Sequence, residues 1–407
     1  MSNKSQTDQS LTLKGDDALQ LWRKGRAAWN EWIAKNSGAY INFGNTNFSH
    51  ERDNDGDLSF SGYDFGTGGT SFVRAEFGDG DVDFSEATFG GTEVDFSFAK
   101  LNSGDLFFTK TRFLASSSFA RTDFGIGGLY FEDTFFSGDE LEMSLAKIGE
   151  LFFRPASIEL KEINAQGLHV KRLGLFDLSE SSSKLELLDL LGSSFEGPLF
   201  LKGNLKSVPD LLATRSSNQV ELSELKVMLR RKSPFHNWLR HIYKVAVDPE
   251  DSVRLRRLKE IAETNKDHQT ALRFSADENR ARRWQETSFL GSFLDAIFSA
   301  SSNYGQNILR PFVALILLTL ASICLYKTFA SELSLTLEKS WGHAITLAAS
   351  NSLPFLPQSR SLRDDAIKVL YSDAPNLLVD AIMIGQGILS FIFLFLIGLG
   401  LRNRFRL

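Results

Sequence analysis

Side chains that could bind a metal ion or act as nucleophiles are few in this chain of 407 residues. Of its six histidines, only His236 and His241 lie close together, and no carboxylate or thiolate accompanies them at ligand spacing. Residues 51–56, ERDNDG, match the start of a calcium-binding loop, but position twelve of that loop is Gly62, where a glutamate is needed. Cys324 lies in an apolar segment, where a thiol packs as a small hydrophobic group. We therefore expect no metal site.

Sequence motifs of the common enzyme classes are also missing. GxxxxGK[ST], GxGxxG, GxSxG and HExxH do not occur, so phosphate-loop, dinucleotide-binding, hydrolase and zinc-peptidase activities have no support. A single cysteine excludes a disulfide framework within one chain. The sequence predicts a protein that is not an enzyme, with no catalytic residue and no cofactor.

Polar residues in the apolar C-terminal region are better candidates for function. Gln386 and Ser390 are four residues apart, so on a helix they share a face. Polar groups in membrane helices face the bundle interior or water. These two side chains therefore either line a pore or form hydrogen bonds between helices. Asn351 and Ser352, at the end of another apolar segment, are further candidates for lining a pore.

Two uncharged segments near the C-terminus are long enough to cross a membrane. Residues 311–326 contain no charged residue, and Arg310 and Lys327 can extend this span by reaching the two interfaces. Residues 381–401 form a second uncharged run of 21 residues. At ~1.5 Å per residue, such a helix crosses the hydrocarbon core, which is ~30 Å thick. We predict spans at about 309–329 and 381–401, with the lipid bilayer as a partner.

Basic residues concentrate on one side of these spans. Arginines at 280, 282 and 283 precede the first span, and those at 402, 404 and 406 follow the second. The loop 331–380 has four bases against six acids, and the N-terminal segment has no apolar run that could form a signal peptide. By the positive-inside rule, we expect both termini to be cytoplasmic and the loop to face outward. The outer mouth of a pore would then gather four carboxylates, those of Asp364, Asp365, Asp373 and Asp380.

The loop between the spans carries its own helical signal. Residues 338–357 are moderately apolar and begin like a helix, which Pro354 would stop. A helix of this length cannot cross the membrane, which suits a re-entrant segment. Such backbone is tolerated at membrane depth only when it is buried in protein or lines water. The alternative is a helix lying on the outer membrane surface.

A repeat of large apolar residues fills the first half of the chain. From residue 60 to residue 148 these residues are spaced by alternating steps of 5 and 7, apart from one step of 6, and then by steps of 5 to residue 178. A further register runs from Leu185 to Leu205. Neither the strand period nor the helix period produces this spacing, whereas a coiled solenoid does. The expected core includes Phe65, Phe72, Phe77, Phe84, Phe89, Phe96, Phe113, Phe124, Phe131 and Phe136.

The repeat units resemble those of the pentapeptide-repeat family, which read A(D/N)LXX. Residues 87–91, ATFGG, and 122–125, TDFG, carry the match. The resemblance implies a right-handed quadrilateral β-helix over residues 41–206. The steps of 7 insert two residues, often with glycine, so we expect two bulged corners in each turn.

The segments on either side of the repeat predict helices. Residues 16–36, with Trp22, Trp29 and Trp32 at near-helical spacing, are expected to cap the first coil, within a domain of residues 1–40. Residues 207–303 read as a helical cytoplasmic connector. Its stretch 226–259 holds ten bases and three acids, which we interpret as contacting anionic lipid headgroups rather than nucleic acid.

The remaining domain, residues 304–407, resembles a known membrane module. Its segments YGQNILRP (304–311), NSLPF (351–355) and LGLRNRFRL (399–407) are similar to the C-terminal part of bacterial pentapeptide-repeat proteins that end in two spans and a pore loop. The resemblance implies an ion-channel-like homo-oligomer, with a tetramer-like pore, in the bacterial inner (cytoplasmic) membrane. No TVGYG-like filter is present, so potassium selectivity is not implied.

Three functions remain open from the sequence. The first is an ion-channel-like membrane protein whose cytoplasmic β-helix acts as a sensor or scaffold. The second is a non-conducting, membrane-tethered scaffold whose acidic β-helix docks a protein partner. The third is an acidic DNA mimic that acts on a topoisomerase, since residues 41–160 carry 21 acids and 8 bases. Acidic side chains also simply keep a solenoid soluble, so direct contact with nucleic acid is not expected.

Overall fold

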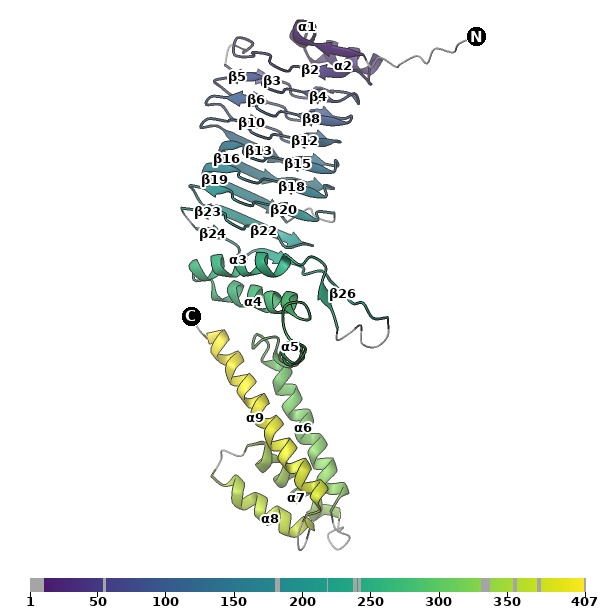
Figure 1. Ribbon diagram of the computed structural model, residues 1–407, viewed down its shortest axis with the longest axis vertical. Coiled ribbons are helices and arrows are strands. Elements are labelled where there is room, and N and C mark those ends of the chain that lie inside the picture. The colour runs from purple at the N-terminus through teal and green to yellow at the C-terminus, as the bar shows by residue number, and fades with distance from the viewer. Residues whose placement is uncertain are drawn as a thin grey trace, which may run out of the picture. The chain divides into compact units, whose positions relative to one another are not determined.

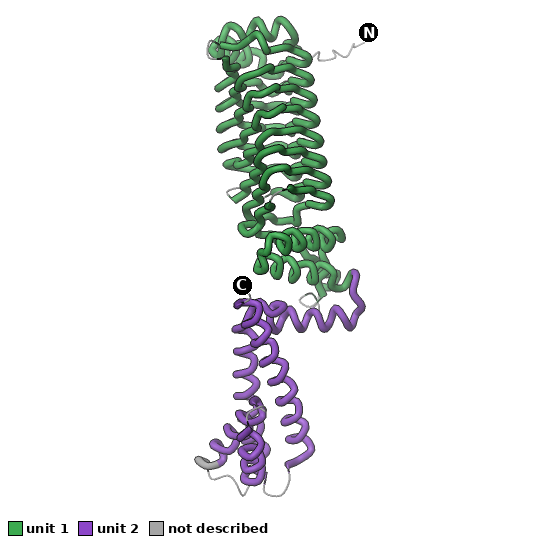
Figure 2. Tube along the Cα trace, turned by 90° about the vertical axis from the view of Figure 1, so that its left-hand side faces the viewer, with its two compact units in different colours: residues 1–285 green, residues 286–407 purple. Residues whose placement is uncertain are grey.

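The computed structural model describes residues 11–53, 56–179, 184–217, 219–236, 240, 243–330, 337–353, 357–371 and 375–405. The chain divides into two compact units, residues 1–285 and 286–407 (Figure 2). The first unit contains a parallel β-solenoid of about seven turns followed by helices, and the second is helical (Figure 1).

The solenoid is built from parallel ladders in which each strand pairs with strands one turn away. The first sheet consists of β1 (Thr12–Lys14), β2 (Tyr40–Asn42), β4 (Thr70–Ser71), β8 (Glu93–Asp95), β12 (Ser116–Ser118), β15 (Glu140–Glu142), β18 (Glu162–Asn164) and β20 (Leu187–Asp189). The second sheet consists of β3 (Leu58–Ser59), β6 (Val82–Asp83), β10 (Leu106–Phe107), β13 (Gly128–Glu132), β16 (Lys147–Arg154), β19 (His169–Leu178), β21 (Ser194–Phe195) and β23 (Arg215–Ser216), with β22 (Leu199–Leu205), β24 (Val220–Glu221) and β25 (Leu225–Val227) paired beside them. The third sheet consists of β7 (Thr88–Phe89), β11 (Arg112–Phe113), β14 (Phe135–Phe136) and β17 (Ser157–Ile158), and β5 (Glu76–Gly78) pairs with β9 (Lys100–Leu101).

The strand register reproduces the repeat seen in the sequence. Thr70 pairs with Val94 and Val82 pairs with Leu106, so one turn takes 24 residues, the length of two steps of 5 and two of 7. Core side chains one turn apart therefore stack. Phe60 lies on Phe84 with ring centroids 4.6 Å apart. The ten phenylalanines expected in the core are all buried, with at most 1% of each exposed.

A small residue recurs at the corner within each step of 5 from Ala75 to Ala146. The residue before it has a positive φ of 52–60° in seven successive corners, at Arg74, Glu86, Phe98, Lys110, Arg121, Asp133 and Leu145. The small side chain lies against the backbone of the preceding turn: Thr111 Oγ1 donates a hydrogen bond to the Phe84 carbonyl at 2.7 Å. A larger side chain has no room in these seven corners, which explains why each of them holds alanine or threonine.

The later turns depart from the expected steps of 5. Strands β16 and β19 are 8 and 10 residues long, and a β-bulge interrupts their pairing between Ile148 and Glu150. In long strands inward positions follow a two-residue period, so Phe176 is buried whereas Leu173, which the repeat placed inward, is only half-buried. Phe200 is half-buried for the same reason. The parallel ladder also continues to Val227, beyond residue 206, where the sequence suggested that it ends.

The N-terminal end of the solenoid is covered by two helices rather than by one. Helices α1 (Gly15–Arg23) and α2 (Arg26–Lys35) are separated by Gly25, whose φ of 87° favours glycine. Trp29 is fully buried, stacks on Phe43 at 5.8 Å and donates its indole N–H to the Asp64 carbonyl at 2.7 Å. These contacts cover the core of the first turn, whose strand β2 pairs with β1.

The opposite end of the solenoid is closed by helices α3 (Asp251–Thr264) and α4 (His268–Arg282). Their side chains bind backbone carbonyls of the last turns: Arg257 Nη2 donates to Thr214 at 2.8 Å and Asn265 Nδ2 donates to Val220. Leu255 and Leu258 extend the solenoid core. Between the solenoid and these helices, β26 (Arg231–Lys232) and β27 (Val245–Ala246) pair antiparallel, where the sequence suggested helix.

Asp251, at the start of α3, makes stability depend on pH. It is 6% exposed, and burial, together with the Asp248 carboxylate, raises its pKa from 3.8 to about 6 despite the nearby Arg254. The folded state therefore binds the extra proton between pH 4 and 6, so this site's contribution to stability falls as pH rises through that window. Above it, the ionised carboxylate costs on the order of 3 kcal/mol.

Asp251→Asn is thus expected to raise the free energy of unfolding at pH 7.5 and to leave it unchanged below pH 4. Urea unfolding of both forms across this range measures the difference. A difference that does not shrink with falling pH would contradict the assignment.

The second unit contains five helices in its described residues: α5 (Phe289–Ser302), α6 (Leu309–Thr328), α7 (Leu337–Ser352), α8 (Ser359–Tyr371) and α9 (Leu377–Phe405). Helices α6 and α9, of 20 and 29 residues, are long and apolar enough to cross a membrane. They are close at one end, where Gly400 leaves room for Ile308; a Cβ on Gly400 would lie 2.7 Å from the Ile308 side chain.

Candidate functional site in the helical unit

A buried cluster of polar side chains joins the two long helices to α7. At its centre is Gln386 of α9, which is 2% exposed. Its Oε1 accepts hydrogen bonds from the Tyr326 hydroxyl at 2.6 Å and from Asn351 Nδ2 at 3.2 Å. Its Nε2 donates to Ser352 Oγ and to the Ala348 carbonyl, both at 2.9 Å. We call Thr319, Tyr326, Asn351, Ser352 and Gln386 the Gln386 cluster.

The other members of the cluster also form hydrogen bonds within the chain. Asn351 Nδ2 donates to the Met383 carbonyl at 2.7 Å, and the hydroxyls of Ser352 and Thr319 share a hydrogen bond of 2.9 Å. Each of these bonds joins different helices, among α6, α7 and α9. The amide group of Gln386, the Nδ2 of Asn351 and the hydroxyl of Ser352 thus form hydrogen bonds between helices, which was one of the two roles open to Gln386.

Ser390, the fourth pore-lining candidate, is also buried in the protomer. It is completely inaccessible to solvent, and its hydroxyl has no hydrogen-bond partner among the described residues. The face shared by Gln386 and Ser390 therefore packs against the protomer's own helices.

The hydrogen bonds fix how far α7 reaches along the long helices. Near its start, Ser340 accepts a bond from Lys327 at the end of α6, and at its end Ser352 bonds Thr319, eight residues earlier in α6. At ~1.5 Å per residue, the C-terminal end of α7 lies about 12 Å along α6 from Lys327. Helix α8 then returns, since the Tyr371 hydroxyl donates to the Tyr326 carbonyl at 3.0 Å. Helices α7 and α8 form a hairpin that reaches the middle of α6 (Figure 1).

The acidic residues expected at an outer mouth are only partly brought together. Asp364 and Asp380 line a surface hollow of about 670 Å³ between α7, α8 and α9, with Asn351 and Arg363. The Arg363 guanidinium lies 3.6 Å from the Asp364 carboxylate. Asp365 is exposed on α8 and does not line the hollow. Asp373 lies outside the described residues.

Helix α5 presents an apolar face that the sequence interpretation missed. Phe289, Leu290 and Leu294 are 76%, 66% and 57% exposed, and Phe293 and Ile297 continue the same surface. Residues 289–302 were assigned to a cytoplasmic connector. These five residues are one, three or four positions apart in the sequence. That spacing is the signal that could have identified an amphipathic helix just before the first span.

A column of outward-facing side chains on the solenoid was also missed. Phe107, Tyr130 and Phe152 are in register on successive turns, and their rings stack at 5.1 and 5.2 Å. Leu175 and Phe200 continue the column on the next two turns. The three rings are half-buried. The residues of this outer column alternate with core residues along each strand, so the spacing of the inward residues does not reveal them.

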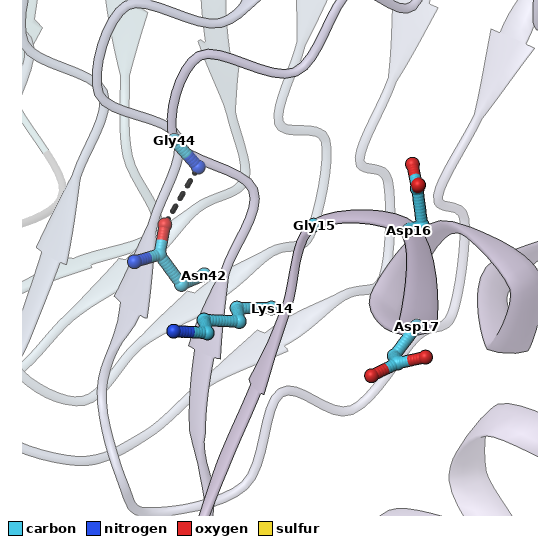
Figure 3. Close-up of a pocket in the computed structure, with 6 residues that line it drawn as sticks. All are labelled: Lys14, Gly15, Asp16, Asp17, Asn42 and Gly44. Carbon is cyan, nitrogen blue, oxygen red and sulfur yellow. Dashed lines mark hydrogen bonds between the residues drawn. The ribbon is translucent and has the colours of Figure 1, made fainter.

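A hollow of about 370 Å³ lies at the N-terminal end, lined by residues that include Lys14, Asp16, Asp17 and Asn42. Figure 3 shows that Asp16 and Asp17 point in different directions, while Asn42 Oδ1 accepts the Gly44 N–H at 2.7 Å. Across the described part of the chain, no three His, Cys, Asp or Glu side chains are grouped as a metal site would require. This hollow has no converging ligands.

No family model, curated protein or solved structure matches this chain. The fold and the site define its class as a parallel β-solenoid joined to a helical unit in which two helices could cross a membrane.

Proposed function

We propose that this protein is a membrane-embedded, ion-channel-like homo-oligomer, with a cytoplasmic solenoid of the pentapeptide-repeat type as its sensor or scaffold. The observation that carries the proposal is the depth of the α7–α8 hairpin, whose inner end bonds Thr319 in the middle of the uncharged run 311–326. A hairpin that enters a bilayer partway and returns is the form of a re-entrant pore segment.

Two further features support insertion with both termini in the cytoplasm of a bacterial cell. The exposed apolar face of α5 comes just before the first span, where an amphipathic helix lies well in the membrane interface. Arg402 and Arg404 follow the second uncharged run, as expected for a cytoplasmic end. In the solenoid, the 24-residue turn with four large inward residues supports the four-sided form, and its right-handed sense is proposed from the resemblance to pentapeptide repeats.

A non-conducting, membrane-tethered scaffold is the second candidate. The outer column of Phe107, Tyr130 and Phe152 favours it, because an apolar ladder on a solenoid surface suits a protein partner. The acidic surface of residues 41–160 would make a basic partner the better match.

Currents from purified protein in planar bilayers distinguish these functions. A carboxylate pair at the outer mouth concentrates cations, so a KCl gradient is expected to give a reversal potential that shows cation preference. Asp380→Asn should reduce that preference. Asp365→Asn is the matched control, because Asp380 lines the hollow and Asp365 does not. The absence of current at high protein density would favour the non-conducting scaffold. A preference for anions would refute the proposal that carboxylates line the outer mouth.

A further inference from the structure

Helix α8 carries a row of charges on its outer surface. Arg360, Asp364 and Lys368 are spaced by four residues, so they share one face, and all three are exposed. Leu362 and Val369, seven residues apart, form a second exposed strip on the same helix, with 47% and 44% of each accessible. The helix thus has a charged side and an apolar side, neither of which is covered within the described part of the protomer.

The hydrogen bonds of the hairpin place this charged row at membrane depth. At the start of α8, Ser359 Oγ donates to the Leu353 carbonyl at 3.0 Å, next to Ser352, which is bonded to Thr319. At its end, Tyr371 reaches the carbonyl of Tyr326, the last residue of the uncharged run in α6. Arg360 and Asp364 therefore lie between the middle of the span and its outer end.

Charges at this depth cannot face lipid at low cost. Lys, Arg and Asp at the centre of a membrane helix are each unfavourable when they face lipid, and they occur where water or protein surrounds them. The hollow of about 670 Å³ between α8 and α9, which Asp364 lines, gives water a path to this face. Because a single protomer leaves the charged row exposed, it cannot by itself shield these side chains from lipid.

We propose that the Arg360–Asp364–Lys368 face of α8 lines a water-filled vestibule that a second copy of this chain closes off from lipid. This inference rests on the proposed membrane insertion and deepens it. The side chains that contact water in the pathway are those of the α8 row, together with Asn351 in the lining of the hollow, whereas Gln386 is buried inside each protomer. The apolar strip of Leu362 and Val369 faces lipid or protein.

Cysteine accessibility in membranes tests the vestibule directly. Full-length Cys324→Ser provides a background without native thiols, since Cys324 is the only cysteine. Single cysteines replace Arg360, Asp364 or Lys368, with matched controls at Leu362 and Val369 on the same helix. A membrane-impermeant, charged methanethiosulfonate applied from outside should react at the charged row at least ~10-fold faster than at the controls, because a buried or lipid-facing thiol stays un-ionised.

The partner copy is tested by cross-linking. In the same membranes, a bis-maleimide should convert Asp364→Cys to a covalent dimer, and Leu362→Cys should remain monomeric or cross-link less. Equal labelling of both strips would show that the hairpin lies on the outer surface and would overturn the vestibule. Labelling of the charged row without any cross-linked dimer would refute the proposal that a second copy closes the vestibule. Extraction of the whole chain by alkaline carbonate would instead refute membrane insertion, and with it the proposed function.

Discussion

Replacing Phe89 with aspartate is expected to unfold the solenoid at ordinary temperatures. Phe89 is fully buried and stacks between Phe65 and Phe113 of the neighbouring turns, at centroid distances of 4.5 and 5.1 Å. Truncating a buried Phe costs about 3–5 kcal/mol, and an unpaired buried carboxylate adds several more. Together these approach the whole stability of a typical domain, about 5–15 kcal/mol.

Two further variants make this result interpretable. Phe89→Leu keeps an apolar side chain of the kind that the repeat accepts, so it should lower the free energy of unfolding by only about 1–2 kcal/mol. Asp83→Asn is the surface control: its Oδ1 accepts the Ser85 N–H at 2.8 Å, and asparagine can keep that bond. Circular dichroism of the full chain in detergent measures the melting temperatures. Equal shifts for Phe89→Asp and Asp83→Asn would refute the inward assignment of Phe89.

Replacing Gln386 with leucine is expected to loosen the helical unit. Leucine has similar volume but cannot form any of the four hydrogen bonds that Gln386 makes with Tyr326, Asn351, Ser352 and the Ala348 carbonyl. Each interhelical bond within a membrane protein contributes roughly 0.6–2 kcal/mol. Because Asn351 and Ser352 would also lose a buried partner, we expect a total loss of about 2–4 kcal/mol.

Ser390→Ala is the matched control for this experiment. Ser390 lies one helical turn from Gln386 and is equally buried, yet its hydroxyl has no hydrogen-bond partner among the described residues. Its removal should be neutral or slightly stabilising. Resistance to denaturation by increasing SDS in mixed micelles compares the two variants. If Ser390→Ala destabilised the protein as much as Gln386→Leu, the cluster would not be the contact that joins α6, α7 and α9.

The repeat in the sequence was enough to predict the first turns of the solenoid. Phe65, Phe72 and Phe84 are buried where the steps of 5 and 7 placed them, because in short strands the corner spacing alone decides which residues point inward. Leu173 and Phe200 broke this rule. In the long strands β19 and β22 the two-residue strand period replaces the corner spacing, and strand length depends on pairing with the neighbouring turns.

The sequence by itself also determined the two apolar segments, because length and the absence of charge are properties of a single helix. It showed that Gln386 and Ser390 share a face, but not what that face meets. Only the tertiary structure decided that it meets Asn351 and Ser352 of α7, so that the bonds are made within the chain. It likewise brought Asp364 of α8 and Asp380 of α9 to one surface hollow. A helical period specifies which side chains point the same way, whereas their surroundings depend on elements that are distant in the chain.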